Sequence, residues 1–518
     1  MQLIHFRNIH KSLFIFFGFA FLQIHGYSQR SIQVNSIDEF TLRDQQMLNG
    51  WSPFTSFTVR PLFVADSSNV MKLLVGINHQ PKLKKGNIAF YANPLDITFQ
   101  GNSHSTWGRN NGSFLSVKGH QQKISTGFNI TGKYFDIQFL PEWFYASQTP
   151  FIKNGYNTVS LGQSAIRLHL GNTPLSVSFS NENIWWGPGI FNSLMMSNNA
   201  PGFEHFSIHT RRPLKTLLGA FEFQIIGGIL KSDPNLPMEN FNLNRYDQVF
   251  GPMRVNNDRF FSGINMAYQP SFLKGLTVGV NRMFQYYVDD KAAGENFTQR
   301  YFPVFTSIFK KGAGGLQEDA RNRDQLINVF TRFVFPNNAL EVYGEYGWND
   351  HKYNLRDFTL NPDGAAAYIV GLRKVLPLKK NKHLTVEAEL TEMEPSNSDI
   401  GRPSGNWYVH GSVLEGYTHQ NQILGGGVTP GDNTATIRIS LSHPNFARQS
   451  ITLERYQHNP RFNATNWTDY SINLMHQQKI NKHFLVNAYV DLVRRKGYTW
   501  SNDNIINIQW GLKTIYYW

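Results

Sequence analysis

The chain has 518 residues, of which 41% are hydrophobic, 14% aromatic and only 16% charged, and Lys and Arg outnumber Asp and Glu by 49 to 36. This hydrophobic content can bury a large surface, which argues against intrinsic disorder. The absence of cysteine excludes a disulfide scaffold, a thiolate metal site and a diacylated lipoprotein anchor. The basic surplus suits an anionic partner.

The first 28 residues have the layout of a cleaved secretory signal peptide. Arg7 and Lys11 give a basic start, and residues 12–22 are mostly apolar but too short to span a bilayer stably. We expect export and cleavage near Ser28; the alternative is a small buried or anchoring helix. After residue 28 no apolar run of about 18 residues occurs, so no helical membrane span is expected.

Residues 29–87 are expected to form a separate N-terminal segment. Ser36, followed three residues later by Glu39, predicts a capped helix that runs to Leu48. We place this segment in the periplasm or, as a partial plug, inside the lower end of a barrel. Two short strands are also predicted in it, at Ser56–Leu62 and Val70–Ile77.

Many later segments alternate between apolar and polar residues, which is the period of a β-strand. In residues 383–391, Leu384, Val386, Ala388 and Leu390 alternate with Thr385, Glu387 and Glu389. Such segments are longer than the usual soluble strand of about 5–6 residues and suit a tilted membrane strand of about 9–11 residues. A mean hydropathy of −0.37 does not argue against this, because averaging conceals the alternation.

Short turns and long connections alternate strictly between these segments, as in outer-membrane barrels. The sequence therefore predicts an all-β fold, a closed antiparallel transmembrane β-barrel of about 18 strands over residues 88–518, with long extracellular loops. The terminal Trp518 suits the inner interface. Loops 289–323 and 394–432 are long enough to fold into the mouth. The predicted strands are 88–100, 118–131, 133–146, 162–170, 174–182, 204–212, 216–231, 258–270, 274–288, 324–335, 338–349, 365–377, 382–393, 433–443, 447–457, 468–479, 482–495 and 504–518.

Enzyme and metal motifs fail on inspection. Residues 162–166 open like a nucleophile elbow, but Ile166 stands where the final glycine should be. No His-Glu-x-x-His occurs and the 17 His are scattered, so neither a metal site nor a cofactor is predicted. Charged residues on strand faces are interpreted as lumen-lining: Glu341, Glu345, Glu387, Glu389, Arg438, Asp491 and Lys513.

Two alternatives use the same charged residues. In the first, the barrel is a channel for small solutes or oligosaccharides, and these side chains line its passage. In the second, the paired glutamates make an outer-membrane hydrolase that acts on surface glycan.

The predicted exterior loops are rich in Trp beside amide and guanidinium groups. Sugars have apolar C–H faces and hydroxyls that need hydrogen-bond partners, so this combination suits a glycan. The glycan-binding candidates are Trp107, Arg109, Trp185, Trp186, Asn198, Asn199, Trp407, Arg461 and Trp467. The alternative is an aromatic girdle with folded loop cores. Acidic polysaccharide, lipopolysaccharide and membrane lipid are expected partners, and nucleic acid is not.

Several stretches together resemble the Wzi family of capsule assembly proteins, in its Bacteroidota form, from about residue 36 to the end. They are 183–190 (NIWWGPGI), 193–203 (SLMMSNNAPGF), 139–142, 341–347, 356–358, 407–410, 416–419 and 454–455. The resemblance implies an eighteen-stranded outer-membrane barrel that acts, without catalysis, as a lectin-like protein attaching or organising capsular polysaccharide. Family members can be closed by folded-in loops and plugged from below by helices; residues 29–87 offer one helix. We expect a monomer.

Overall fold

The computed structural model describes residues 29–49, 55–65, 74, 80–104, 107–147, 155–233, 235–236, 258–290, 297, 301–305, 323–349, 355–360, 362, 364–396, 407–444, 446–458, 467–496 and 504–518. The predicted signal peptide and the glycan candidate Arg461 lie outside these residues. So does all of the predicted strand Val70–Ile77 except Leu74, which is buried.

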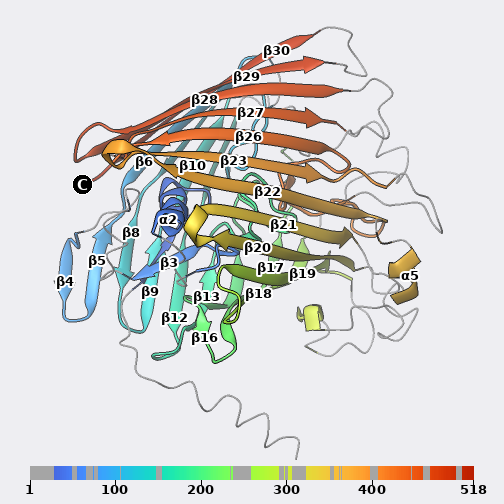
Figure 1. Ribbon diagram of the computed structural model, residues 1–518, viewed down its shortest axis with the longest axis horizontal. Coiled ribbons are helices and arrows are strands. Elements are labelled where there is room, and N and C mark those ends of the chain that lie inside the picture. The colour runs from blue at the N-terminus through green and yellow to red at the C-terminus, as the bar shows by residue number, and fades with distance from the viewer. Residues whose placement is uncertain are drawn as a thin grey trace, which may run out of the picture.

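The fold is all-β, with one large, mostly antiparallel sheet of 24 strands (Figure 1). Its strands are β4 (Leu83–Lys85), β5 (Ile88–Ala92), β6 (Leu95–Asn102), β7 (Gly119–Ser125), β8 (Phe128–Thr131), β9 (Phe135–Phe139), β10 (Glu142–Ala146), β11 (Tyr156–Ser160), β12 (Ala165–His169), β13 (Leu175–Ser180), β15 (His205–Thr210), β16 (Leu214–Lys215), β17 (Gly219–Leu230), β18 (Arg259–Pro270), β19 (Leu276–Tyr287), β20 (Asp324–Phe335), β21 (Leu340–Asn349), β22 (Ala366–Pro377), β23 (His383–Glu392), β26 (Asn433–Ser442), β27 (Arg448–Gln457), β28 (Thr468–Lys479), β29 (Phe484–Lys496) and β30 (Ile505–Tyr516).

The remaining elements lie outside this sheet. They are β1 (Gln29–Ile32) with β3 (Leu62–Ala65), β2 (Val59–Arg60) with β14 (Trp185–Trp186), the hairpin β24 (Thr418–His419) and β25 (Gln422–Ile423), the helices α2 (Ile37–Leu48) and α5 (Leu355–Leu360), and the short 3₁₀ turns Pro303–Phe305, Pro336–Asn338 and Lys379–Asn381.

Strand pairing follows the order of the chain. From β17 to β23 and from β26 to β30 each strand pairs with the next, and β23 pairs with β26. The last strand, β30, pairs with β6 near the start, from Gln509 opposite Asn102 to Tyr516 opposite Leu95. The early strands are split in two: β5 pairs with β8 while β6 pairs with β7, and β8 pairs with β9 while β7 pairs with β10.

Most predicted strands coincide with observed ones within a few residues, because long period-2 segments are a strong signal. One expectation is wrong. Residues 147–161 were predicted to be a loop, but Tyr156–Ser160 form β11, which pairs with β10. This strand is short and its residues are mostly polar or aromatic, so it lacks the alternation that marks the others.

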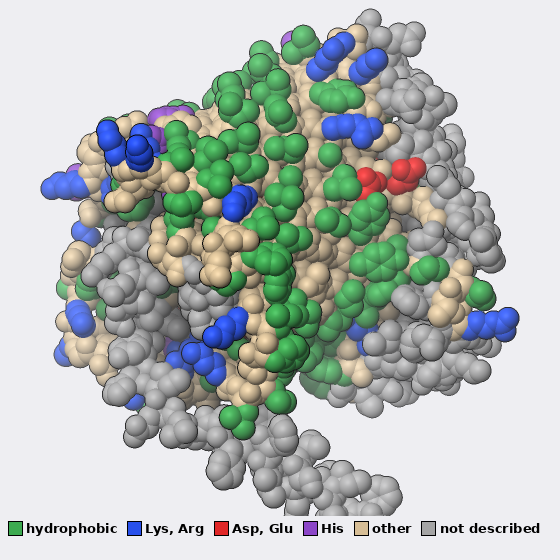
Figure 2. All heavy atoms as spheres, in the orientation of Figure 1, with side chains coloured by type: hydrophobic (Ala, Val, Ile, Leu, Met, Phe, Trp, Pro, Cys, Tyr) green, Lys and Arg blue, Asp and Glu red, His purple; other side chains and the backbone are tan. Residues whose placement is uncertain are grey.

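The sheet is apolar outside and polar inside. On β22, Tyr368, Val370 and Leu372 are 40–53% exposed, whereas Arg373, the residue after Leu372, points to the other face and is fully buried. On β27, Ile451 and Leu453 are likewise about half exposed. Figure 2 shows hydrophobic side chains spread over the outer surface of the strands. This is the reverse of a soluble protein, which keeps large apolar patches covered.

Helix α2 lies within the curve of the sheet and packs against β22 (Figure 1). Its predicted cap is confirmed: the Ser36 hydroxyl accepts a hydrogen bond from the Glu39 N–H, and Asn49 ends the helix. The Glu39 carboxylate in turn accepts from the Asn35 N–H at 2.5 Å. No described helix is both long and apolar enough to cross a membrane.

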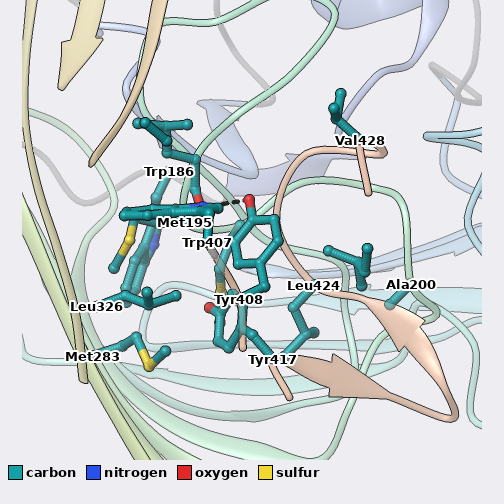
Figure 3. Packing of buried hydrophobic residues seen from close by; sticks show 14 of the residues in the cluster. Trp186, Met195, Ala200, Met283, Leu326, Trp407, Tyr408, Tyr417, Leu424 and Val428 are labelled. Carbon is teal, nitrogen blue, oxygen red and sulfur yellow. Dashed lines mark hydrogen bonds between the residues drawn. The ribbon is translucent and has the colours of Figure 1, made fainter. Parts of the chain in front are cut away.

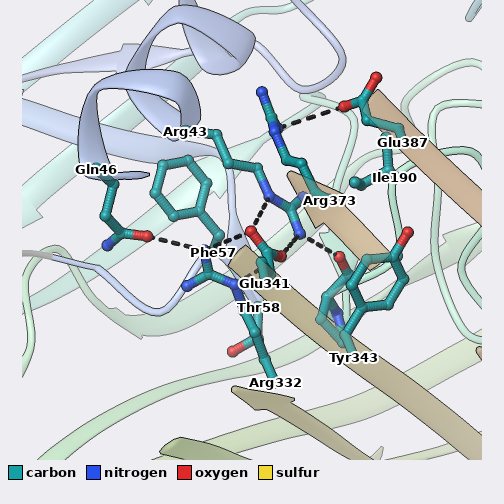
Figure 4. A network of polar contacts seen from close by, with 12 residues as sticks. Arg43, Gln46, Phe57, Thr58, Ile190, Arg332, Glu341, Tyr343, Arg373 and Glu387 are labelled. Atoms are coloured by element: carbon teal, nitrogen blue, oxygen red, sulfur yellow. Dashed lines mark hydrogen bonds and ion pairs between the residues drawn. The ribbon is translucent and has the colours of Figure 1, made fainter. Parts of the chain in front are cut away.

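Buried ion pairs tie α2 to the inner face of the sheet (Figure 4). Arg43 of the helix pairs with Glu341 of β21, whose carboxylate also receives Arg332 of β20 at 2.9 Å. Next to it, Asp44 pairs with Arg373 of β22. Burial alone would raise the pKa of the Asp44 carboxyl, but the charges of Arg373 and His383 outweigh burial and hold that pKa well below its usual range.

Loop segments fill the interior beside α2 (Figure 3). Residues 183–203 and 407–428 contribute many of the side chains of one large apolar cluster, including Trp186, Met195 and Trp407. The Tyr408 hydroxyl donates to the Leu194 carbonyl at 2.8 Å and so joins the two segments. The described part of loop 394–432 therefore folds inward.

We expect Arg373→Gln to destabilise the protein by about 3–5 kcal/mol, because it leaves the buried carboxylates of Asp44 and Glu387 short of a partner. The midpoint of urea unfolding in lipid vesicles measures this. Lys374→Gln, at the next position of the same strand, should change stability by no more than about 0.5 kcal/mol. Equal midpoints for the two variants would show that the buried pairs do not hold α2.

Candidate functional site

A cavity of about 500 Å³ lies inside the sheet. One wall is the inner face of β6 and of β26–β30, and the other is formed by residues 107–114 with Phe40 and Phe191. Its lining is mostly polar and charged, with a few aromatic rings. Representative lining residues are Gln100, Glu454, Tyr456, Asp491, Gln509 and Lys513.

The loop that covers the cavity depends on a tight backbone path. Gly108 has φ +115°, and a Cβ placed there would lie 2.6 Å from the Gln509 side-chain nitrogen. L side chains rarely adopt this positive φ, so the backbone conformation favours glycine here. The Gln509 amide also donates to the Trp107 carbonyl at 2.9 Å, which fixes the start of the loop on β30.

Trp107 is held between charged groups at the edge of the cavity. Its indole N–H donates to Asp491 at 3.0 Å, and the Arg495 guanidinium lies 5.6 Å from its ring centroid. The ring meets Tyr456 edge-on at 6.3 Å. Trp107 is only partly buried, so part of its surface remains available to a ligand.

Arg109 reaches the same region from the loop. It forms an ion pair with Glu454 of β27, and its guanidinium lies 5.2 Å from the Tyr456 ring centroid. Both partners line the cavity. The guanidinium and carboxylate thus present donors and acceptors next to an aromatic ring.

Trp107 and Tyr456 begin a row of aromatic rings, which continues through His458 to Trp467. His458 lies 4.3 Å from Tyr456 and stacks on Trp467 at 4.0 Å between centroids. The His458 ring nitrogens contact Asp432 at 3.1 Å and Asp469 at 2.9 Å. Burial alone would lower the pKa of His458, but the two carboxylates outweigh it and raise the pKa.

The two candidate asparagines are used to build the loop. Asn198 lines the cavity, and its side chain donates to the Asn110 carbonyl at 3.2 Å. Asn199 is buried; its side-chain oxygen accepts from the Asn110 N–H at 3.1 Å and its amide donates to the Ile423 carbonyl. Both therefore position residues 107–112 against residues 198–199.

Three candidate tryptophans lie away from the cavity. Trp185, Trp186 and Trp407 are each at most 1% exposed. The Trp186 indole donates to Gln224 at 2.8 Å, and the Arg60 guanidinium lies 4.6 Å from the Trp185 ring centroid. Their burial leaves no surface for a sugar. Of the five candidate tryptophans, Trp107 and Trp467 are the two that lie in the aromatic row.

Of the lumen-lining candidates, the four glutamates are fully engaged inside the protein. Glu341 and Glu387 face arginines. Glu389 accepts backbone N–H groups of residues 190–192 at 2.7–3.1 Å, and Glu345 accepts from the Leu194 N–H at 3.0 Å. These carboxylates serve as anchors for α2 and for the loop 187–194.

The other three charged candidates border the cavity. Arg438 pairs with Glu387 at 2.5 Å and lies over Phe40 and Phe191. Lys513 pairs with Asp96 at 2.6 Å, and Asp491 holds Trp107. Each charge on the cavity wall is thus matched by a neighbour of opposite sign or by a hydrogen-bond donor.

Sequence reasoning did not find Tyr456, His458 or Asp432. Tyr456 and His458 stand at the end of β27, at alternate positions that share a face, whereas Asp432 precedes β26. The alternation of Tyr and His next to a predicted loop is the only signal that could have pointed to them. Within the described part of the chain, no cluster of His, Asp or Glu could hold a metal ion.

A family model described as capsule assembly protein Wzi matches residues 96–505. Among solved structures, the chain is similar to Escherichia coli Wzi, described as an outer membrane protein involved in group 1 capsule assembly and a carbohydrate binding β-barrel. The identity is 14%, the match covers 93% of this chain and 99% of that chain, and the TM-score is 0.62, which shows the fold.

Two other solved structures match more weakly. Pseudomonas aeruginosa OccK5 (OpdH) is 8% identical, over 83% of this chain and 98% of that one, with a TM-score of 0.43. Acinetobacter baumannii OccAB3 is 9% identical, over 82% and 98%, with a TM-score of 0.44. A sequence comparison with curated proteins finds no match.

The His458 pairs predict a pH dependence. Because the folded protein raises the pKa of His458 above 6.5, its ion pairs stabilise fully below that pH, and this stabilisation is lost as the pH rises through the raised pKa. We therefore expect the thermal midpoint to fall with rising pH above about 6.5 more steeply in the wild type than in His458→Gln. Parallel pH profiles would contradict the assignment.

Proposed function

The chain belongs to the Wzi family of capsule assembly proteins, as its sequence predicted, and we propose that it binds surface or capsular polysaccharide and helps to assemble or attach it at the cell surface. Similarity to E. coli Wzi, a carbohydrate binding barrel, supports this function. The proposal includes export by the signal peptide of residues 1–28 and integration into the outer membrane as a monomer.

The proposed architecture is a closed barrel of about 18 strands over residues 88–518, with residues 29–87 as a partial plug. Pairing of β30 with β6 supports closure. The number follows if each split strand is counted once, namely β5 with β6, β7 with β8, β9 with β10, β11 with β12 and β15 with β16, and if the three-residue β4 is left out. The apolar outer face suits lipid, because its hydrophobic side chains would contact acyl chains instead of water.

One observation carries the binding function: a polar cavity of about 500 Å³ beside a row of aromatic rings. Aromatic faces stack on the apolar faces of sugars, and carboxylates, amides and guanidinium groups bind hydroxyls. Trp107, Arg109, Asn198 and Trp467 are the sequence candidates retained for this site. Tyr456 joins them.

Because the charges on the cavity wall are paired with one another, the cavity suits a ligand that is recognised through its hydroxyl groups better than one recognised through its net charge. Arg109, Arg438 and Lys513 each have a carboxylate partner. The formal charge of +13 of the whole chain would then attract an acidic polysaccharide or lipopolysaccharide at longer range.

The same contacts support a non-catalytic role. A general acid or base must reach the bond that it cleaves. Glu345 and Glu389 instead accept backbone N–H groups of the protein itself, and Glu341 lies between two arginines. We therefore expect no turnover of bound glycan.

Trp107→Ala should weaken binding of the purified capsular polysaccharide by about fivefold or more, the equivalent of about 1 kcal/mol for a lost stacking contact. Biolayer interferometry with the detergent-solubilised protein measures this. Trp510→Ala on the outer face of β30, where Trp510 is 43% exposed, is the matched control and should leave binding unchanged. An unchanged affinity in Trp107→Ala, with heat-modifiable migration intact, would remove this cavity from the proposal.

A further inference from the structure

The sheet has a break on one side, between β11 and β17. The register pairs β11 with β10, and among the described residues its other edge has no strand beside it. The reason is that β13 ends at Ser180 and β15 begins at His205, while the 24 residues between them turn inward and form β14. Beyond Ser180, therefore, no strand of the described residues joins β11 to β17.

Side chains and a loop frame this break. At its base Gln163 donates to Asn183 at 2.6 Å, and at the opposite end the Tyr156 hydroxyl donates to Asp233 at 2.9 Å. The far edge carries an exposed ion pair, Lys231 with Glu204, at 3.6 Å. These side-chain contacts replace the continuous backbone ladder found elsewhere in the sheet.

A second cavity, of about 280 Å³, occupies the break. Its inner floor is the hairpin β24–β25: the Gln420 N–H donates to the Lys231 carbonyl at 2.7 Å, and the Lys231 N–H donates to His419 Nδ1 at 3.1 Å. Burial, reinforced by the charge of Arg259, lowers the pKa of His419 to about 3, so the ring is neutral and free to accept. The floor is thus rigidly attached to the far edge.

The lining of this second cavity combines apolar and polar side chains. At the outer rim Val159 is 73% and Leu161 42% exposed. Behind this edge, the hydroxyl, amide and carboxylate groups of Ser160, Gln422 and Glu142 lie among buried apolar side chains, those of Leu115, Phe144, Phe203 and Leu236. Exposed apolar side chains on the β11 edge, with hydrogen-bonding groups behind them, fit a molecule that has a lipid part and a hydroxyl-rich part.

The break also borders the central cavity. Ser113, Glu142 and Gln163 line both cavities. The Ser113 hydroxyl donates to Glu142 at 2.6 Å, and Lys123 approaches the same carboxylate at 3.4 Å. A thin partition of polar side chains therefore separates the side of the sheet from the proposed glycan site.

We propose that this break is a lateral window that admits the sugar chain of a lipid-linked glycan from the outer leaflet as far as the polar partition beside the central cavity. The proposal rests on the proposed function, because it takes the apolar face to be in lipid. Open strand edges are not tolerated in hydrocarbon, where backbone N–H and C=O groups need partners. Sugar hydroxyls supply such partners at the free edge of β11, while the lipid remains outside against Val159 and Leu161.

The test compares two probes and two variants. The probes are lipopolysaccharide from the host bacterium in phospholipid vesicles, and its polysaccharide released by mild acid. Thr158→Trp fills the window, since Thr158 lines the cavity, whereas Asn157→Trp places the same side chain on an exposed neighbouring position. We expect Thr158→Trp to lower binding of the lipid-linked probe by about tenfold and to leave the released probe unaffected.

The outcomes separate the two proposals. Equal binding of lipid-linked probe by Thr158→Trp and Asn157→Trp would overturn the window. A wild-type protein that binds neither probe would overturn the proposed function as well.

A second measurement does not depend on how Thr158→Trp folds. The chain has no cysteine, so Ser160→Cys carries a single benzophenone label. Photo-crosslinking to lipopolysaccharide from this position, but not from Asn157→Cys, supports the window; equal yields contradict it.

Discussion

Charges that face inward need partners supplied by the chain itself, and the rest of this structure depends on that constraint. The sheet places Arg332, Glu341 and Arg373 on its inner face, where each is fully buried. An unpaired charge in such surroundings costs several kcal/mol. Helix α2 supplies partners for two of them: Arg43 pairs with Glu341, and Asp44 pairs with Arg373. The same ion pairs hold the helix inside the sheet.

The same principle fixes the loops. Glu345 and Glu389 bind successive backbone N–H groups of residues 189–194 and so pull the loop 183–203 inward. Its apolar side chains then pack with Trp407 and Tyr408 to form a core inside a polar wall. What remains is the central cavity and the side break, two spaces with a shared polar partition. The break arises because the residues that enter the core are those that would otherwise have extended β13 and β15.

Sequence alone predicted the parts set by local pattern. Period-2 alternation located the long strands, and Ser36 with Glu39 located the start of α2. It could not predict the site, which depends on contacts between distant residues. Trp107 meets Asp491 across 384 positions, and a tryptophan in a loop has the same local signature whether it lies beside a cavity, as Trp107 does, or in the core, as Trp186 does.

We propose that the chain itself fills the interior, so that the protein binds glycan and does not conduct solutes. A barrel of about 18 strands is otherwise wide enough for an aqueous channel. The most direct test is single-channel recording of the full chain in planar bilayers, with a porin in the same bilayer as a positive control. We expect little or no steady conductance after insertion. Steady, porin-like conductance would contradict it and favour a transport channel.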